Sequence, residues 1–494
     1  MNARKFICLL VILSLMVLPV LSCGGTAGTV GSTTALAGGN EADTGVTDAS
    51  SQATEANTKD PNYVPDLGEA DFGGYEFNAL GKFIDQPDGS WNTFEIYAEK
   101  EDGTLINDAV YRRNVALEDK YNFKVKQTRV KDTLLATVRK NISSGDIPYD
   151  LILPPSKEAT TLATEGALTD LKSVTNLNLS KAYWNQNLEK YTAINNKVFY
   201  CTGDINIMDK QATWVVYFNK DMISSLGLES PYNLVRAGKW TMDAFNSMLK
   251  DVTKDLNGDG KYDKNDQFGL LTHDGGIAGF NYYAGEPIVS KTNSGVLEIT
   301  LNNERTVAAV DKGIEMLSGN KTYLFPDWLI GQNMFEAGQS LFYMEVLDKT
   351  GQLRNMQIPF GVLPPPKLDE AQPQYNTCIA DVAQLFCIPS NCADLSRAGF
   401  ILEALAAGST DTLKKAYYDL NLTVKFVRDE DSVEMIETIM KGVIYDIGTI
   451  YGLGNMNSIV GNSIKKGTNK FVSDYEKNEP KAQAALQKFI DAFN

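Results

Sequence analysis

Apolar residues recur with two different periods along the first ordered part of the chain. Residues 105–121 and 132–142 carry apolar side chains at helical spacing, whereas residues 122–130 alternate apolar and polar positions. Residues 75–80 and 149–153 are short apolar segments typical of strands, and two prolines end the second. The order strand, helix, strand, helix, strand predicts an α/β lobe with a mainly parallel sheet.

The loops that follow the predicted strands are candidate walls of a binding site. Ligands of parallel sheets lie at the carboxyl ends of the strands, which here are the loops after Leu80 and Leu153. Further along, residues 240–245 open a helix, with Thr241 as its N-cap. Phe268–Leu271 is typical of another strand.

A separate apolar run, Phe6–Leu21, stands at the N-terminus. Arg4 and Lys5 precede the run, Ser22 and Cys23 follow it, and it is too short for a comfortable membrane span. The arrangement resembles the lipobox of bacterial lipoproteins, which are cut before the cysteine and lipidated on its thiol. The resemblance implies a signal peptide over 1–22 and a lipid anchor, such as palmitate, on Cys23. The alternative is an ordinary secretory signal with an incidental cysteine.

The segment after Cys23 is expected to be a disordered tether. Residues 24–60 are rich in Gly, Ser, Thr and Ala and contain no aromatic residue. No later apolar run approaches the length of a membrane span, so only the lipid would hold the mature chain to the cell membrane, outside the cytoplasm. A lipobox serves both bacterial envelope types, so the envelope stays open.

The chain is acidic, with a formal net charge of −16. This charge argues against nucleic acid and other polyanions as partners, because both require a basic surface. It is compatible with a neutral or cationic ligand, or it serves only to keep the protein soluble.

Four cysteines remain after the signal and the lipidated residue are set aside. They allow three pairings, and the sequence does not choose among them. A metal site on them is not expected, because there is no C-x-x-C and His273 is the single histidine. One disulfide within 378–392 and buried free thiols both remain open. The four are Cys201, Cys378, Cys387 and Cys392.

Six short motifs occur in a characteristic order along residues 71–494. The order resembles the solute-binding lipoproteins of ABC transporters, in the branch that includes oligosaccharide- and maltose-binding proteins. Phe218 departs from this pattern, since the family most often has Tyr there. The motifs are YDLILPP (149–155), EGALTDL (165–171), WVVYFNKDMISSLGLESP (214–231), KWTMDAF (239–245), FEAGQSLFYME (335–345) and FGVLPPPK (360–367).

The resemblance implies a two-lobe α/β fold of the periplasmic-binding-protein type, with a ligand cleft between lobes joined by hinge crossings. Residues 61–204 with 343–388 would form the first lobe, and residues 205–342 with 389–494 the second. Lobes of this kind close on the ligand by a hinge motion. The crossings are expected near Tyr200–Ile205, Ser340–Glu345 and Phe386–Ser390.

The function implied is that of a monomeric binding protein of an ABC importer. It would capture a solute, a sugar or oligosaccharide, and deliver it to the membrane permease. The chain contains no G-x-S-x-G, H-E-x-x-H or P-loop motif that would indicate an enzyme. His273 is expected to be a surface histidine or one whose hydrogen bonds are satisfied. The alternatives are a cell-surface glycan-binding lipoprotein and a lipoprotein glycoside hydrolase, neither with a transport role.

Residues 255–266 carry the pattern of a calcium loop, D-x-[DN]-x-[DN]-G-x5-[DE]. Calcium requires six or more oxygen ligands, and Gly260 would permit the sharp turn. Lys261 would contribute its backbone carbonyl, and the other ligands would be side chains. The expected role is structural, and the alternative is an acidic turn without metal. The proposed ligands are Asp255, Asn257, Asp259, Lys261, Asp263 and Asp266.

Sugar sites pair stacked aromatic rings with carboxylate or amide partners, because sugars combine polar rims with apolar faces. The candidates here rest on their position in the implied fold and not on a motif. Core packing is the alternative for any one aromatic residue. The candidates are Trp91, Asp204, Trp214, Tyr282, Tyr283, Trp328, Tyr343 and Glu345.

Overall fold

The structure is a computed structural model that describes residues 65–84, 91–131, 133–146, 148–422 and 430–493. The chain divides into Met1–Asn57 and Thr58–Asn494, and the described residues all belong to the second unit. The predicted signal peptide, Cys23 and the tether therefore lie outside the described residues. Within the described part, no helix is long and apolar enough to cross a membrane.

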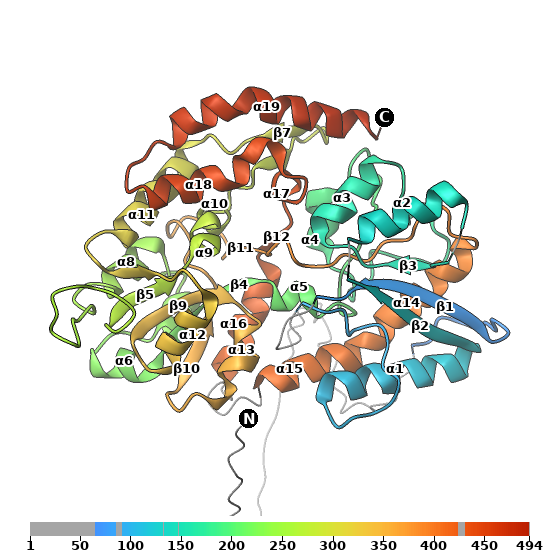
Figure 1. The fold of residues 1–494 in the computed structure, drawn as a ribbon, viewed down its shortest axis with the longest axis horizontal. Coiled ribbons are helices and arrows are strands. Elements are labelled where there is room, and N and C mark those ends of the chain that lie inside the picture. Colours follow the sequence, from blue (N-terminus) through green and yellow to red (C-terminus); the bar gives the residue numbers. More distant parts are fainter. Residues whose placement is uncertain (1–64, 85–90, 132, 147, 423–429, 494) are drawn as a thin grey trace, which may run out of the picture. The chain divides into compact units, whose positions relative to one another are not determined.

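The first lobe is built on a parallel sheet with the described strand order β2-β1-β3 (Figure 1). Phe77 and Phe123 point to one side of this sheet and pack with Tyr121, whereas Leu80 and Ile152 point to the other side. The order of elements confirms the predicted alternation of strand and helix. The elements are β1 (Tyr75–Lys82), α1 (Leu105–Tyr121), β2 (Phe123–Val130), α2 (Leu134–Ser144), β3 (Leu151–Ile152) and α3 (Ser156–Thr164).

Figure 1 shows α1 and α14 (Leu395–Ser409) on one side of this sheet and α2 and α3 on the other. Helix α1 ends where Asn122 adopts a left-handed conformation (φ 53°), which turns the chain directly into β2. The tight connection explains why helix and strand share a boundary in the sequence pattern.

The second lobe is built on a larger sheet with the described order β10-β4-β9-β5-β8. Strand β4 runs antiparallel to both neighbours, and β5 runs parallel to β8 and β9. The predicted strand at Phe268–Leu271 is confirmed as β5. The strands are β4 (Trp214–Asn219), β5 (Phe268–Thr272), β8 (Thr322–Leu324), β9 (Ser340–Val346) and β10 (Phe360–Leu363).

Helices cover both faces of the second sheet. Helices α9, α10, α11 and α18 contact one another above one face, whereas α12 contacts β5 and β9 and α16 contacts β10 (Figure 1). The predicted N-cap Thr241 is confirmed, since its hydroxyl accepts the Ala244 amide at 3.2 Å. The helices of this lobe are α6 (Lys220–Ser225), α7 (Pro231–Arg236), α8 (Met242–Met248), α9 (Asp274–Ala278), α10 (Phe280–Tyr283), α11 (Glu304–Leu317), α12 (Trp328–Glu336), α13 (Lys349–Gln352), α16 (Glu430–Lys441), α17 (Ile447–Ile450), α18 (Met456–Lys465) and α19 (Phe471–Asp491).

The remaining elements are short and lie mainly in the connections. They are η1 (Leu171–Ser173), α4 (Gln186–Thr192), α5 (Met208–Gln211), β6 (Val289–Lys291), β7 (Leu297–Ile299), η2 (Leu353–Asn355), β11 (Thr377–Cys378), the π-helix η3 (Thr410–Lys414), α15 (Lys415–Leu422), β12 (Val443–Ile444) and η4 (Leu453–Asn455).

The chain crosses between the lobes along paired segments. Cys201 bridges to Phe386 beside the first sheet, and Thr213 bridges to Ile379 at the start of β4. Residues 201–213 and 377–388 therefore run between the same two sheets. Helix α15 contacts α1 of the first lobe, and helix α16 contacts β10 of the second sheet.

The expected return crossing near Ser340–Glu345 is wrong. This segment belongs to β9, which is hydrogen bonded between β4 and β5 and buried at every position. A strand enclosed on both faces and both edges cannot act as a hinge. The return comes later, at 377–388, so β9 and β10 lie in the second lobe. Helix α14, expected in the second lobe, packs on α1 in the first.

The four described cysteines are free thiols. Cys201, Cys378 and Cys387 are buried, and Cys392 is partly exposed. The buried free thiol, one of the two expectations, is therefore the one found, and no disulfide joins Cys378 and Cys392.

Candidate functional site

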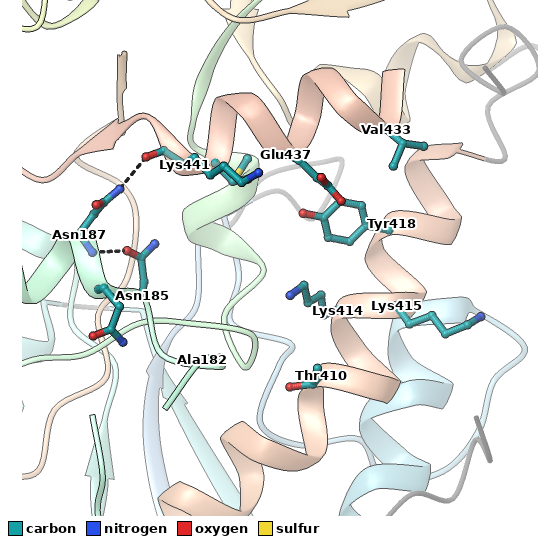
Figure 2. Close-up of a pocket in the computed structure, with 12 residues that line it drawn as sticks. Ala182, Asn185, Asn187, Thr410, Lys414, Lys415, Tyr418, Val433, Glu437 and Lys441 are labelled. Atoms are coloured by element: carbon teal, nitrogen blue, oxygen red, sulfur yellow. Dashed lines mark hydrogen bonds between the residues drawn. The ribbon is translucent and has the colours of Figure 1, made fainter. Parts of the chain in front are cut away.

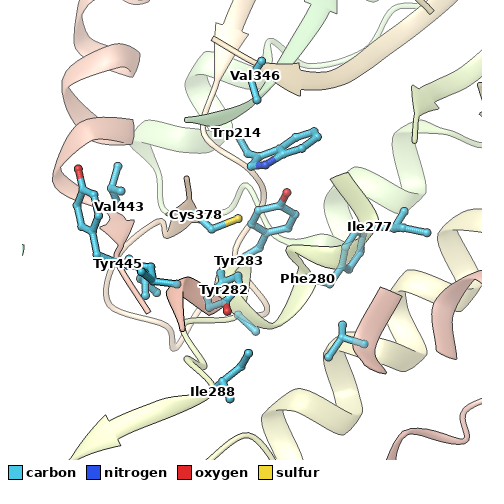
Figure 3. Close-up of a cluster of buried hydrophobic side chains, with 14 of the residues drawn as sticks. Trp214, Ile277, Phe280, Tyr282, Tyr283, Ile288, Val346, Cys378, Val443 and Tyr445 are labelled. Atoms are coloured by element: carbon cyan, nitrogen blue, oxygen red, sulfur yellow. The ribbon is translucent and has the colours of Figure 1, made fainter. Parts of the chain in front are cut away.

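A cavity of about 410 Å³ opens where the lobes meet beside the second crossing. Aromatic side chains, glycines and hydroxyl or carboxylate groups form its walls. Figure 3 shows Trp214, Tyr282, Tyr283 and Cys378 gathered in this region. The lining residues are Lys157, Trp214, His273, Gly275, Ala278, Gly279, Tyr282, Cys378, Ile379, Ala380, Asp381, Ile444, Asp446, Thr449, Ile450, Gly452 and Asn457.

Trp214 and His273 form an aromatic wall of this cavity. Their ring centroids are 5.2 Å apart. Trp214 begins β4, and because β4 is antiparallel to β9 its first residue lies at the edge where β5 ends. A Cβ atom added at Gly275 would lie 2.7 Å from the Trp214 ring, so the ring rests directly on the glycine backbone. This close approach fixes the ring face that borders the cavity.

His273 is held through Nδ1, which accepts the Gly275 amide at 3.2 Å. Its Nε2 lies 3.2 Å from Oε2 of Glu345, an ion-pair distance at which Oε2 forms no hydrogen bond. Glu345 is buried behind the histidine. The pair therefore orients the imidazole and leaves mainly its carbon edge and its face for a ligand.

Asp446 anchors the opposite wall. Its carboxylate accepts the amides of Ile288 (2.7 Å), Val289 (3.2 Å) and Gly448 (2.8 Å). It also accepts the hydroxyl of Tyr282 at 2.8 Å. Burial raises the pKa of Asp446 above its usual value, and these hydrogen bonds act against that rise. The network fixes the Tyr282 ring against the cavity.

The mouth of the cavity carries exposed polar groups. Lys157 comes from α3 of the first lobe, and Asp381 comes from the second crossing. Within the described residues, neither side chain is hydrogen bonded or ion paired. Both groups are therefore available to the polar rim of a ligand.

The predicted site residues separate into three groups. Trp214 and Tyr282 line the cavity, and Glu345 reaches it through His273. Tyr283 and Tyr343 are fully buried: the Tyr283 hydroxyl donates to the Gly276 carbonyl at 3.0 Å, and Tyr343 stacks on Tyr217 and Phe335. These two tyrosines therefore belong to the core.

The remaining predicted residues lie away from this cavity. Asp204 accepts the Thr410 hydroxyl at 2.9 Å and pairs with Lys414 at 3.1 Å. Trp328 follows β8, is 45% exposed, and has the Lys349 ammonium 4.0 Å from its ring centroid. Trp91 is partly buried, with its backbone in the left-handed region (φ 63°).

The sequence patterns did not indicate His273 and Asp446 as cavity residues. His273 directly follows β5, so its place at the carboxyl end of a predicted strand was a usable indication. Asp446 had no such indication, because its partners Tyr282, Ile288 and Val289 lie more than 150 positions away in the sequence.

A second, larger and more open cavity of about 780 Å³ lies between α4, α15 and α16. Figure 2 shows Lys414 and Tyr418 facing Asn185 and Asn187 across it. Asn187 donates to the Lys441 carbonyl at 2.9 Å, which closes one end. Its walls are mainly amide and lysine groups with a single tyrosine ring, so the smaller aromatic cavity suits a sugar better.

The predicted calcium loop has its carboxylates turned to backbone amides. Asp255 accepts the amides of Gly258 (2.7 Å) and Gly260 (2.8 Å). Asp266 is buried and accepts the amides of Leu256 and Asp263, both at 2.9 Å. Across the described parts of the chain, no three or more His, Cys, Asp or Glu side chains are grouped to hold a metal ion. In this arrangement the two carboxylates hold the turns of the loop, and calcium binding by it stays a prediction.

Known structures share this fold. The chain resembles the galacto-N-biose/lacto-N-biose I-binding protein of a Bifidobacterium longum ABC transporter (TM-score 0.56, 12% identity, covering 85% of this chain and 98% of that chain). It also resembles M. tuberculosis UspC (0.56, 13%, 83% and 100%) and a cyclo/maltodextrin-binding protein complexed with maltotetraose (0.53, 13%, 86% and 97%). These likenesses support the two-lobe fold expected from the sequence.

The family of the chain follows from its sequence. Among curated protein sequences none matches this chain. Residues 115–424, more than half of its length, match the model of the bacterial extracellular solute-binding proteins, a family of binding proteins and not of enzymes. The match covers β2, the first crossing, the whole second sheet and α14. The chain belongs to the bacterial extracellular solute-binding protein family.

Proposed function

We propose that this protein captures a sugar or oligosaccharide between its lobes and delivers it to the permease of an ABC importer. The observation that carries the proposal is the cavity at the lobe junction, where Trp214 and Tyr282 present aromatic faces. Lys157 and Asp381 add polar groups from the first lobe and the crossing. This combination matches the apolar faces and polar rims of sugars.

Two of the structural neighbours support a carbohydrate ligand. One is described in complex with lacto-N-biose and another in complex with maltotetraose. Both share the fold of this chain. The lipobox-like N-terminus supports attachment of the binding protein to the outer face of the membrane that would hold the permease. We propose that the binding protein acts as a monomer.

A binding screen tests the proposal. The mature chain from residue 23, with Cys23→Ser to prevent lipidation, is expected to show a raised melting temperature with at least one mono-, di- or oligosaccharide. Calorimetry should then give a stoichiometry of one and no released product. A stabilising shift with peptides or polyamines and with no sugar would contradict the carbohydrate assignment.

Calcium binding by the 255–266 loop stays a prediction. The expected result is a higher melting temperature with calcium than with chelator, lost in Asp255→Asn. Each Asp255 oxygen that accepts a backbone amide keeps a further lone pair, which is what a calcium ligand needs. Asp274→Asn, an exposed acid paired with Lys465, is the control. Equal melting curves in calcium and chelator would remove the metal from this loop.

A further inference from the structure

A third cavity, of about 500 Å³, lies at the carboxyl ends of β1 and β2 in the first lobe. Gly81 of β1 pairs with Arg129 of β2 at this edge of the sheet. The lining combines aromatic rings with positive charge, although the chain as a whole is acidic. The lining residues are Phe83, Tyr97, Gln127, Arg129 and Lys131.

Arg129 carries a positive charge that is oriented by its neighbours without a direct ion pair among the described residues. Its guanidinium lies 4.9 Å from the Phe94 ring centroid and donates to Oε1 of Gln127 at 3.1 Å. Its Nε is buried and has no acceptor, and among the described residues Arg129 forms no ion pair. Burial lowers the pKa of Arg129, and the negative charge of Glu95 acts against that fall.

Gln127 adds a second donor beside it. Because Arg129 donates to Oε1 of Gln127, the amide orientation is fixed, and Nε2 is the donor left over. Nε2 is buried without an acceptor. A Cβ atom at Gly81 would lie 2.7 Å from it, so the amide points across the strand pair to a position that has no side chain. Two N–H donors on one face of β2 therefore have no acceptor.

The nearby acid Glu95 attracts this charge but forms no ion pair with it among the described residues. Oε1 of Glu95 accepts the amides of Ile207 (3.2 Å) and Met208 (3.0 Å) at the start of α5. Its Oε2 is buried and has no hydrogen-bond partner. The Glu95 carboxylate acts on the charges of both Arg113 and Arg129, and the Arg129 guanidinium keeps donors that no acid contacts.

We infer that this cavity is a subsite for a negatively charged group, a carboxylate or sulfate ester, carried by the bound sugar. The inference rests on the proposed function. The guanidinium presents a planar set of donors that matches an oxyanion, and Gln127 supplies a further N–H. Phe83 and Tyr97 supply the apolar surface that a sugar ring needs. The carboxyl edge of the sheet is where ligands of parallel sheets bind, and β3 leads from the same edge to Lys157.

Calorimetry on matched disaccharides tests the inference. The mature chain with Cys23→Ser is titrated with galacturonobiose, with galactobiose, with a sulfated galactobiose and with inorganic sulfate. We expect at least one acidic disaccharide to bind about tenfold more tightly than its neutral counterpart, as a charged hydrogen-bonded contact provides. Preference between the uronic acid and the sulfate ester identifies the anion.

Two variants locate the effect. Arg129→Gln should remove the preference for the acidic sugar and leave neutral-sugar affinity within about twofold. Gln127→Leu keeps the charge of Arg129 and should weaken the preference for the acidic sugar. Arg139→Gln, on the exposed surface of α2 and paired with Glu165, is the matched control and should change neither affinity. Melting curves establish that all three variants are folded.

The outcomes separate the two proposals. Equal binding of acidic and neutral sugars, or an equal loss of both in Arg129→Gln, overturns the anion subsite and leaves carbohydrate capture standing. Binding of sulfate that depends on Arg129, without an acidic-sugar preference, also overturns it. Failure to bind any sugar in the wider screen overturns the proposed function itself.

Discussion

Trp214→Leu is expected to lower sugar affinity by at least about thirtyfold, the effect of removing an aromatic anchor worth ~2 kcal/mol. The leucine keeps an apolar side chain against Gly275 but removes the flat face beside His273. The sugar would then lose its stacking surface while the polar rim stayed in place. Calorimetry with the sugar identified by the screen measures the change.

Trp240→Leu is the control for this prediction. Trp240 is fully buried in the second lobe, where its indole donates to the Pro364 carbonyl at 2.9 Å, and it does not line the cavity. It should lose stability and retain affinity at a temperature well below its melting point. Wild-type affinity in Trp214→Leu would show that the ligand binds elsewhere.

Asp446→Ala is expected to cost the protein at least about 3 kcal/mol of unfolding free energy. The substitution leaves three backbone amides without their acceptor in a buried site. It also leaves the Tyr282 hydroxyl with only the Thr449 hydroxyl as a partner, so the ring is held less firmly and sugar affinity should fall with stability. Urea titrations measure the free energy, and calorimetry measures the affinity.

Asp446→Asn removes the ionisable carboxyl group and keeps a side chain of nearly the same size and shape. Burial raises the folded-state pKa of Asp446, so the folded state holds the proton more tightly than the unfolded state. This contribution to stability is complete below the unfolded pKa of 3.8 and is lost as the pH rises through the folded pKa. Relative to wild type, the variant should show a smaller loss of stability across that interval. A pH profile of stability in Asp446→Asn that equals the wild-type profile would contradict Asp446 as the source of this pH dependence.

The sequence predicted the elements of the first lobe well because their apolar periods report directly which faces are buried. Residues 105–121 were predicted as a helix and form α1, and residues 122–130 form β2. The return crossing was misplaced because a hinge segment and a central strand can share the same apolar run. Whether Ser340–Val346 forms a hinge or a central strand depends on its pairing partners, β4 and β5.

Residues of the site could be predicted from the sequence only where the side chain itself suits a sugar site, as a large aromatic ring does. Trp214 and Tyr282 are large aromatics at turns and strand starts, and both line the cavity. Tyr343 has the same chemistry but is enclosed by Tyr217 and Phe335, a placement set by sheet packing. Asp446 gains its role only when residues 282–289 fold against it.

The discontinuous path of the chain has a consequence for when this protein can fold. The core beside α1 is incomplete until α14 has been synthesised, and α19 must follow before η4 and α18 are covered. No fragment made early in translation contains a finished lobe, and contacts between such distant segments form slowly. For an extracellular protein this delay is useful, because a chain that has not yet folded can still be threaded through a narrow export channel.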